Sequence, residues 1–292
     1  MSDCGTKQCD SCQSKQTSVC ETCSSSSDAG QTGQIDQHAK ISKNIDAITN
    51  RIAIVSGKGG VGKSTVTAGI AYNLAKKGFK VGVLDADVSG PNIPHLLNVE
   101  GEKLQGSSEG LLPVIAAHGI RIASAESLVE SSDSPIVWRG PMRSSLINQF
   151  LADMQWGELD FLLVDLPPGT GDEPLSIMQT IPLTGLVMVS TPSSLSILDV
   201  SKIINMARML KVDMLGILEN MAFYECPGCR ERVFPFGEGK VKALSDKYDL
   251  RFLGQLPLDP LNGGRDIITA DDSPTVSMTE EITDKILNIL KR

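Results

Sequence analysis

The residues from Gly57 to Ser64 could hold the phosphate chain of a nucleotide. They read Gly-Lys-Gly-Gly-Val-Gly-Lys-Ser and match the pattern G-x-x-x-x-G-K-[ST]. In such a loop the glycines let backbone N–H groups converge on phosphate oxygens, the lysine reaches the β- and γ-phosphates, and the hydroxyl coordinates Mg²⁺. We therefore predict a Mg-ATP site in which Lys63 binds phosphate and Ser64 binds the metal. Its residues are Gly57, Lys58, Gly59, Gly60, Val61, Gly62, Lys63, Ser64 and Thr65.

Two aspartates, Asp85 and Asp165, each end a short apolar run. An aspartate at the end of a buried strand near such a loop is the usual second support for Mg²⁺. Residues 57–62 also match the dinucleotide pattern G-x-G-x-x-G, for which Asp85 would be the ribose-binding acid. A dinucleotide site has no use for Lys63 and Ser64, and it leaves Asp165 unexplained. The NTPase interpretation is therefore favoured.

Six of the seven cysteines fall into three C-x-x-C pairs. Cysteines at this spacing chelate a metal readily, and cytoplasmic disulfides are rare. A single pair could be a redox dithiol, but three pairs favour a metal or a cluster, and the spacing does not choose between zinc and iron–sulfur. The candidate ligands are Cys9, Cys12, Cys20 and Cys23 as one four-ligand set, and Cys226 and Cys229 as a pair. Cys4 could replace one of the four N-terminal ligands or be spare.

The elements that must position these residues alternate between strands and helices. Apolar runs predict strands at 51–56, 80–84, 159–164, 185–190, 214–218 and 252–256. Because these runs are apolar on both faces, they indicate buried parallel strands. Helical spacing predicts helices at 64–77, 195–210 and 279–292. We predict an α/β fold, with a doubly wound, mostly parallel sheet and helices on both faces.

Composition divides the chain into three regions. Residues 1–35 contain no aromatic residue and are rich in Ser, Gln, Thr, Asp and Cys, so we expect a flexible Cys-rich segment that could bind a cluster. Residues 36–50 place Ile41, Ile45 and Ile48 at helical spacing and predict a linking amphipathic helix. Residues 51–292 are expected to form the P-loop ATPase domain.

Charge and hydropathy exclude several classes of partner. The 292-residue chain has 27 Lys and Arg against 35 Asp and Glu, a formal net charge of −8, and no basic cluster. This balance argues against a nucleic-acid partner and against a polybasic membrane anchor. The chain also has no apolar run of about 18 residues and no signal-peptide core at its N-terminus. We expect a soluble cytoplasmic protein.

A succession of motifs resembles one family of ATPases. Lys58 is an extra lysine near the start of the loop, as in the deviant Walker A class that includes the MinD/ParA ATPases. Four further motifs indicate one branch of this class. They are VLDADVSGPNIP at 83–94, VDLPPGTGD at 164–172, ENM at 219–221 and CPGC at 226–229. Over about residues 45–292 the chain resembles the Mrp/ApbC-type iron–sulfur cluster carrier ATPases.

The resemblance implies catalytic roles for Lys58, Lys63 and Asp87. Lys58 would cross the interface of an ATP-bound dimer and touch the partner's phosphates. Asp87 would position the attacking water, although an aspartate at this place could also cap a helix. The loop at 167–172 would sense the γ-phosphate.

The resemblance also implies nucleotide-binding roles beyond the loop. Asp85 would support the Mg²⁺ shell, and Asp165 would hold Mg²⁺ through water. Asn220 would lie near adenine, although it could also be a turn residue at the end of a strand.

The implied function joins the two sites in a homodimer. A pair of thiolates cannot complete a four-cysteine set, whereas a twofold axis would bring Cys226 and Cys229 of two chains around one [4Fe–4S] cluster. The protein would be a carrier that assembles a cluster, or receives it from a donor, delivers it to apoproteins and hydrolyses ATP slowly. The alternatives are a MinD/ParA-like positioning switch with structural zinc and an ATP-coupled iron–sulfur reductase.

Overall fold

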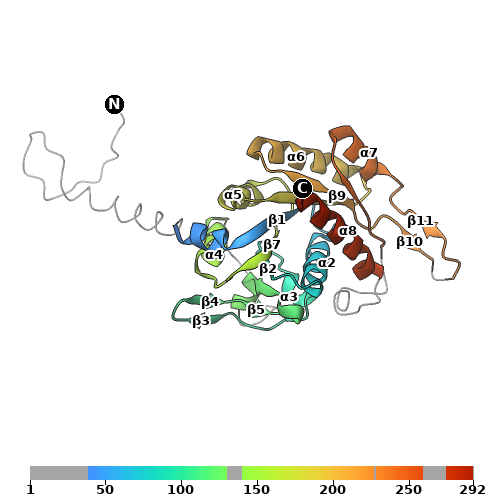
Figure 1. The fold of residues 1–292 in the computed structure, drawn as a ribbon. Helices are drawn as coiled ribbons and strands as arrows, with labels where there is room; N and C mark the ends of the chain where they lie inside the picture. The colour runs from blue at the N-terminus through green and yellow to red at the C-terminus, as the bar shows by residue number, and fades with distance from the viewer. Residues whose placement is uncertain (1–38, 130–139, 227, 259–273, 292) are drawn as a thin grey trace, which may run out of the picture. The chain divides into compact units, whose positions relative to one another are not determined.

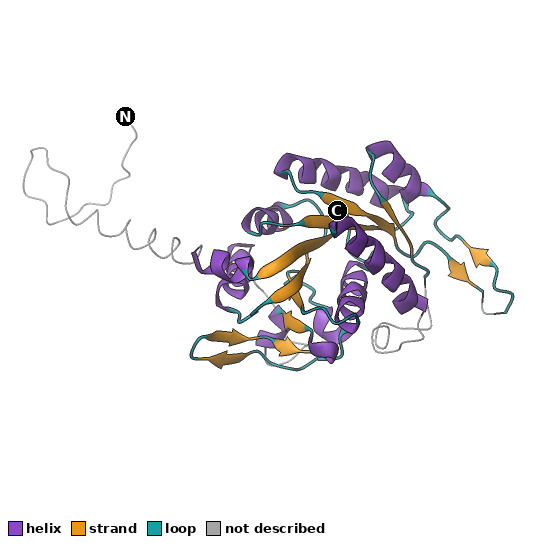
Figure 2. Ribbon diagram, viewed as in Figure 1, coloured by secondary structure: helices purple, strands orange, loops and turns teal. Residues whose placement is uncertain are grey.

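The computed structural model describes residues 39–129, 140–226, 228–258 and 274–291. The predictions for Cys4, Cys9, Cys12, Cys20 and Cys23 lie outside these residues. From residue 40 onward the described residues belong to one compact unit built around an eight-stranded sheet (Figures 1 and 2).

The sheet is parallel except at one edge. In spatial order its strands are β12 (Phe252–Gln255), β9 (Met214–Glu219), β8 (Gly185–Ser190), β1 (Ile48–Ser56), β7 (Leu159–Asp165), β2 (Val81–Asp85), β6 (Arg121–Ala123) and β5 (Val114–Ile115). Only β5 pairs antiparallel within this sheet, with β6. Strands β8, β9 and β12 lie on one side of β1, and β7, β2, β6 and β5 lie on the other, which confirms the predicted doubly wound α/β fold.

Helices cover both faces of the sheet, and because alternate side chains of a strand point to opposite sides, each central strand contributes to two cores. In β1, Ile52 and Ile54 join the core beneath α2 (Lys63–Lys76) and α8 (Pro274–Leu290). Ala53 and Val55 join the core on the other face. That second face is covered by α4 (Gly140–Asp153), α5 (Asp172–Thr180), α6 (Ser194–Leu210) and α7 (Lys240–Tyr248).

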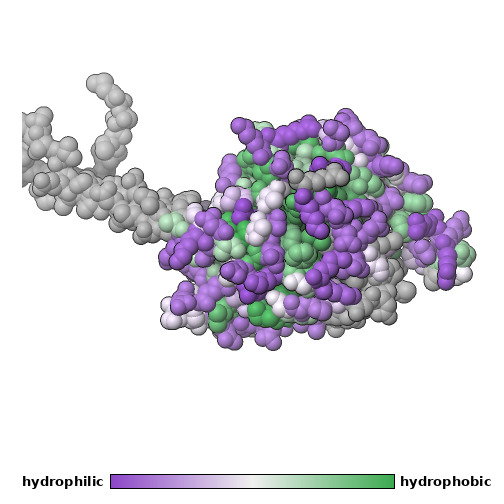
Figure 3. Space-filling model, in the orientation of Figure 1, coloured by the Kyte–Doolittle hydropathy of each residue, from purple (hydrophilic) through white to green (hydrophobic). Residues whose placement is uncertain are grey.

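The C-terminal helix α8 is amphipathic, as its sequence pattern predicts. Ile282 and Ile286 are buried against the sheet, whereas Glu281 is exposed. Figure 3 shows hydrophilic side chains over most of this face of the molecule, including the outer side of α8. None of the described helices is long and apolar enough to cross a membrane.

The region before the sheet differs from its prediction. The helix expected at 36–50 is described over residues 39–46 and has ended before Ile48. Ile48 is instead the first residue of β1, where it pairs in register with Leu159 of β7. Ile41, Ile45 and Ile48 are all buried, but pairing with β7 holds Ile48 in a strand rather than in the predicted helix.

Several short elements were not predicted. They are the hairpin strands β3 (Gln105–Ser107) and β4 (Gly110–Leu112), the hairpin strands β10 (Tyr224–Glu225) and β11 (Arg232–Val233), helix α3 (Ile93–Leu96), and the 3₁₀ turns η1 (Ala117–Gly119) and η2 (Ala125–Leu128). Helices α4, α5 and α7 and strands β5 and β6 were also not predicted. Most of these elements are too short to show a hydrophobic period.

Candidate nucleotide and cysteine sites

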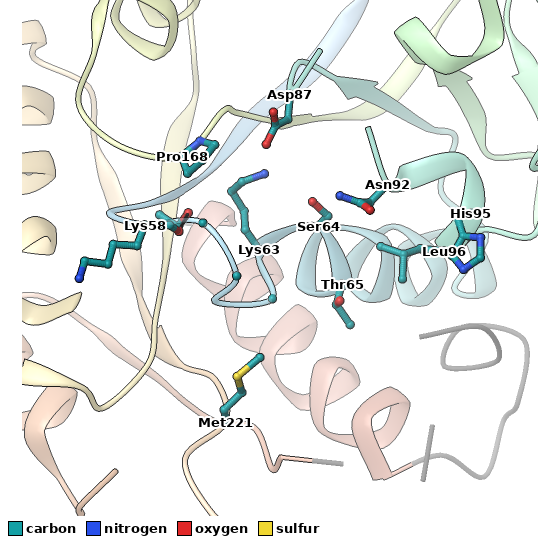
Figure 4. Close-up of a pocket in the computed structure, with 14 residues that line it drawn as sticks. Lys58, Lys63, Ser64, Thr65, Asp87, Asn92, His95, Leu96, Pro168 and Met221 are labelled. Atoms are coloured by element: carbon teal, nitrogen blue, oxygen red, sulfur yellow. Dashed lines mark hydrogen bonds between the residues drawn. The ribbon is translucent and has the colours of Figure 1, made fainter. Parts of the chain in front are cut away.

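The glycine-rich loop connects the carboxyl end of β1 to the first turn of α2. It lies at the edge of the sheet where parallel strands end, the usual place for a ligand in an open α/β sheet. Gly60 and Gly62 both have positive φ, at 75° and 79°, and Gly62 directly precedes the helix. The loop lines a cavity of about 380 Å³, and Lys58, Lys63 and Ser64 are among its lining residues (Figure 4).

We expect replacement of Gly62 by alanine to destroy this loop geometry. Its φ of 79° is strained for an L-residue, and an added Cβ would overlap Nδ2 of Asn220. The backbone strain alone costs about 1–3 kcal/mol. Calorimetric titration with ADP should show a loss of affinity of at least about tenfold. Thermal unfolding gives the fraction of the variant that is folded, and the loss of affinity should be larger than the unfolded fraction explains. Alanine at Gly90, where an added Cβ meets nothing within 4 Å, is the control. Equal ADP affinities for the two variants would contradict the prediction.

Lys63, Ser64 and Thr67 of α2 converge on the carboxylate of Asp165 at the end of β7. The distances are 2.7 Å from Lys63 Nζ to Oδ2, 2.6 Å from Ser64 Oγ to Oδ2, and 2.7 Å from Thr67 Oγ1 to Oδ1. Lys63 Nζ is buried, and it forms this ion pair without a hydrogen bond to any described residue. The Lys63 ammonium therefore keeps donors for an anion, as a phosphate-binding lysine requires.

Asp85 is fully buried beside this cluster. It lies opposite Asp165 in the β2–β7 register and accepts hydrogen bonds from Ile93 N and Ser124 Oγ at 3.2 and 3.3 Å. Its Oδ1 has no hydrogen-bond partner among the described residues. Burial, followed by the nearby charge of Asp165, raises the pKa of Asp85 from 3.8 to about 8. A divalent cation would offset both the burial of the Asp85 charge and its repulsion by Asp165, so these two carboxylates are suited to support a bound Mg²⁺.

Asp85 should make the stability of the ligand-free protein depend on pH. Its pKa is raised on folding, so the folded state binds the proton more tightly, and the free energy of unfolding should fall as the pH rises toward 8. Asp85→Asn removes this titration and should flatten the curve between about pH 5 and pH 8. Urea unfolding of both proteins across this range measures the two slopes. Parallel slopes would contradict the assigned pKa shift.

Asp87 and Lys58 lie on opposite sides of Lys63. Figure 4 shows Lys63 extending toward Asp87, whereas the side chain of Lys58 extends away from both of these residues. Burial is the largest cause that raises the pKa of Asp87, and the charge of Lys63 opposes it. Among the described residues Lys58 forms no ion pair. This arrangement agrees with a lysine available to a second chain, but the catalytic roles of these residues stay predictions.

Asn220, directly after β9, contacts the glycine-rich loop. It is buried, and its Nδ2 donates a hydrogen bond of 2.8 Å to the carbonyl oxygen of Val61. The predicted contact with adenine is not tested by this geometry. The neighbouring Met221, with φ of 55°, lines the cavity.

The cavity contains residues that were not among the predicted site residues. They are Ser56 at the end of β1, Asn92, His95 and Leu96 beside α2, and Met221 after β9. Pro168, which also lines the cavity, belongs to the loop at 167–172 that is expected to sense the γ-phosphate. Asn92 lies in the motif at 83–94 and Met221 in the motif at 219–221, so a sequence signal for these two residues exists. His95 and Leu96 come from the short helix α3, whose packing against α2 has no local sequence signature.

Cys226 and Cys229 lie at the turn of the β10–β11 hairpin, which projects from the sheet in Figure 1. Both are free thiols; Cys226 is half-buried and Cys229 is exposed. The N–H of Cys226 donates to Glu231 O at 3.0 Å, and the N–H of Arg230 donates to Cys226 O at 2.8 Å. Backbone N–H groups of Cys229 and then Gly228 point to the Cys226 sulfur and lower the pKa of its thiol. The hairpin thus favours a thiolate, the form that binds metal.

The hairpin offers two sulfur ligands from one chain. Within the described ranges, no group of three or more His, Cys, Asp or Glu side chains could hold a metal ion. A four-cysteine site at this turn therefore needs further ligands from another molecule or from residues outside the described ranges.

The fold and the loop together define a P-loop NTPase. The chain matches the family described as "ParA: NUBPL iron-transfer P-loop NTPase" over residues 47–291. It is 49% identical over 224 residues to the iron-sulfur cluster carrier protein of Methanocaldococcus jannaschii, across 76% of this chain and 77% of that protein. It is 41% identical over 221 residues to the cytosolic Fe-S cluster assembly factor NUBP2 homolog of Dictyostelium discoideum, across 74% and 83% of the two chains. The protein belongs to this family of iron–sulfur cluster carrier P-loop NTPases, which confirms the family that the sequence motifs predict.

Solved structures agree with this assignment. A nucleotide-binding protein of Archaeoglobus fulgidus, in complex with ADP, superposes with a TM-score of 0.72 at 45% identity, over 82% of this chain and 95% of that one. The cell division ATPase MinD of Pyrococcus furiosus gives a TM-score of 0.61 at 21% identity, over 82% and 99%. The second likeness shows the fold alone.

Proposed function

We propose that this protein is a homodimeric, Mg-ATP-dependent carrier of a [4Fe–4S] cluster that delivers the cluster to apoproteins. The observation that carries the proposal is the exposed Cys226–Cys229 hairpin on the same chain as a complete phosphate-binding loop. Relatives over three quarters of the chain are iron–sulfur cluster carriers, and a structural relative binds ADP. We place the protein in the cytoplasm, in accord with its cytosolic relative.

The nucleotide site is proposed to bind and hydrolyse ATP with residues 57–65. Lys63 and the N-terminus of α2 hold the phosphates, and Ser64 and Asp165 hold Mg²⁺, with Asp85 behind them. Mg²⁺, when bound, offsets the negative charge of the phosphates. Asp87 faces the same cavity and orients the attacking water, while Lys58 extends toward the phosphates of a second chain.

The cluster is proposed to bridge two chains. Each chain supplies Cys226 and Cys229, so that a twofold axis completes the four thiolates that a [4Fe–4S] cluster takes. A cluster held at the turn of an exposed hairpin is open to an incoming acceptor. ATP binding and hydrolysis change the arrangement of the two chains and thereby the access to the cluster. The N-terminal cysteines provide a second cluster-binding segment.

Transfer of a cluster to an acceptor tests this function. The protein is reconstituted anaerobically and mixed with an apo-dehydratase whose activity requires a [4Fe–4S] cluster. We expect activity to appear in the acceptor, at a rate that changes with Mg-ATP. Retention of the cluster on the carrier together with ATP-dependent electron release would support a reductase instead. Binding of zinc alone would support a positioning switch with structural zinc.

A further inference from the structure

Three side chains contact the Asp165 carboxylate, Lys63 as an ion pair and Ser64 and Thr67 as hydrogen-bond donors, and a bound nucleotide would affect them differently. Lys63 and Ser64 line the cavity, whereas Thr67 does not and is fully buried one helical turn behind Lys63. A phosphate chain competes for the Lys63 ammonium, and a metal competes for the Ser64 hydroxyl. Thr67 is thus the donor that a ligand leaves in place.

The Thr67 hydroxyl has two acceptors within reach and one hydrogen to donate. The carbonyl oxygen of Lys63 lies at 3.0 Å, and Oδ1 of Asp165 lies at 2.7 Å. The carboxylate is the shorter and charge-assisted partner, so the hydrogen belongs to Asp165. Because both side chains are buried, water does not compete for this bond.

We propose that Thr67 is a positioning residue for the Mg²⁺ site, because its hydrogen bond fixes the rotation of the Asp165 carboxyl group. With Oδ1 held by Thr67, the other oxygen Oδ2 faces Ser64, where it would support a bound Mg²⁺. Without the hydroxyl, the carboxyl group is free to turn once Lys63 and Ser64 have engaged the nucleotide and metal. This inference rests on the proposed binding of Mg-nucleotide at residues 57–65.

The test separates binding of the metal from binding of the nucleotide. A fluorescent ADP analogue is titrated into the full-length protein, once with excess Mg²⁺ and once with EDTA. For Thr67→Val, which keeps the side-chain shape, we expect Mg²⁺-dependent affinity to fall by about tenfold. Affinity in EDTA should stay within about twofold of the unaltered protein. Thr67→Ser, which keeps the hydroxyl, should restore the Mg²⁺ dependence.

Three outcomes would overturn the inference. The first is that Thr67→Val keeps the full Mg²⁺ dependence of ADP affinity. The second is that Thr67→Val loses affinity equally with Mg²⁺ and in EDTA, which is the result of a merely structural role, and the third is that Thr67→Ser lacks the Mg²⁺ dependence. If Thr67→Val does not fold, Thr67→Cys takes its place, because a thiol is a poor donor of similar size. Absence of any Mg²⁺ effect in the unaltered protein would instead refute the proposed nucleotide site, and this inference with it.

Discussion

Replacement of Lys63 by methionine should abolish ATP hydrolysis and also destabilise the protein. The Lys63 ammonium is 2.7 Å from Asp165, with side-chain exposures of 6% and 1%. Removing one partner leaves the other charge buried, which costs about 3–5 kcal/mol of folding free energy. Loss of a cation aimed at the transferred phosphoryl group should lower the hydrolysis rate by at least about 100-fold. Phosphate release and urea unfolding measure the two effects.

The double variant Lys63→Met/Asp165→Asn separates these two effects. Removal of the stranded carboxylate should recover most of the lost stability, since no uncompensated charge remains at this position. Hydrolysis should stay absent, because neither the phosphate-binding cation nor the metal support is restored. Full hydrolysis by a stably folded Lys63→Met protein would refute the assignment of Lys63.

The second large effect is expected at the hairpin. In a chain whose N-terminal cysteines are replaced by serine, Cys226→Ala/Cys229→Ala should reduce cluster iron and sulfide to background after anaerobic reconstitution. Binding of ADP should change by less than about twofold, because neither cysteine lines the nucleotide cavity. Iron analysis and calorimetric titration give the two readings on the same preparation.

Gly228→Ala is the matched control at the same turn. Its added methyl group would lie 3.9 Å from the Cys226 sulfur, an ordinary contact, and both thiols remain. This variant should hold as much cluster as its parent. Normal cluster content in the double cysteine variant would show that the ligands lie elsewhere.

The sequence predicts those parts of the fold and site that rest on local patterns. The run at 185–190 is apolar on both faces and forms β8, buried at every position. The loop at 57–64 is recognised because its glycines, lysine and serine act together at fixed spacing. Asp85 and Asp165 are found because each ends such a run, and the structure places them opposite one another in neighbouring strands.

The contacts that depend on tertiary packing could not be predicted in this way. Thr67 is 98 residues from Asp165 in the sequence, and its hydrogen bond depends on how α2 lies against β7. Asn220 supports Val61 across 159 residues. The strands of the cysteine hairpin contain two residues each, so no periodicity marks them, although the CPGC motif marks the turn.

Anaerobic reconstitution with simultaneous determination of mass decides whether two chains share one cluster. The protein with its N-terminal cysteines replaced by serine is analysed by size-exclusion chromatography with light scattering, and its iron, acid-labile sulfide and zinc are assayed. We expect a dimer with about four irons and four sulfides per pair of chains, and a monomer when Cys226 and Cys229 are replaced by alanine. A protein that takes up zinc alone, or a complete cluster on a single chain, would contradict this expectation.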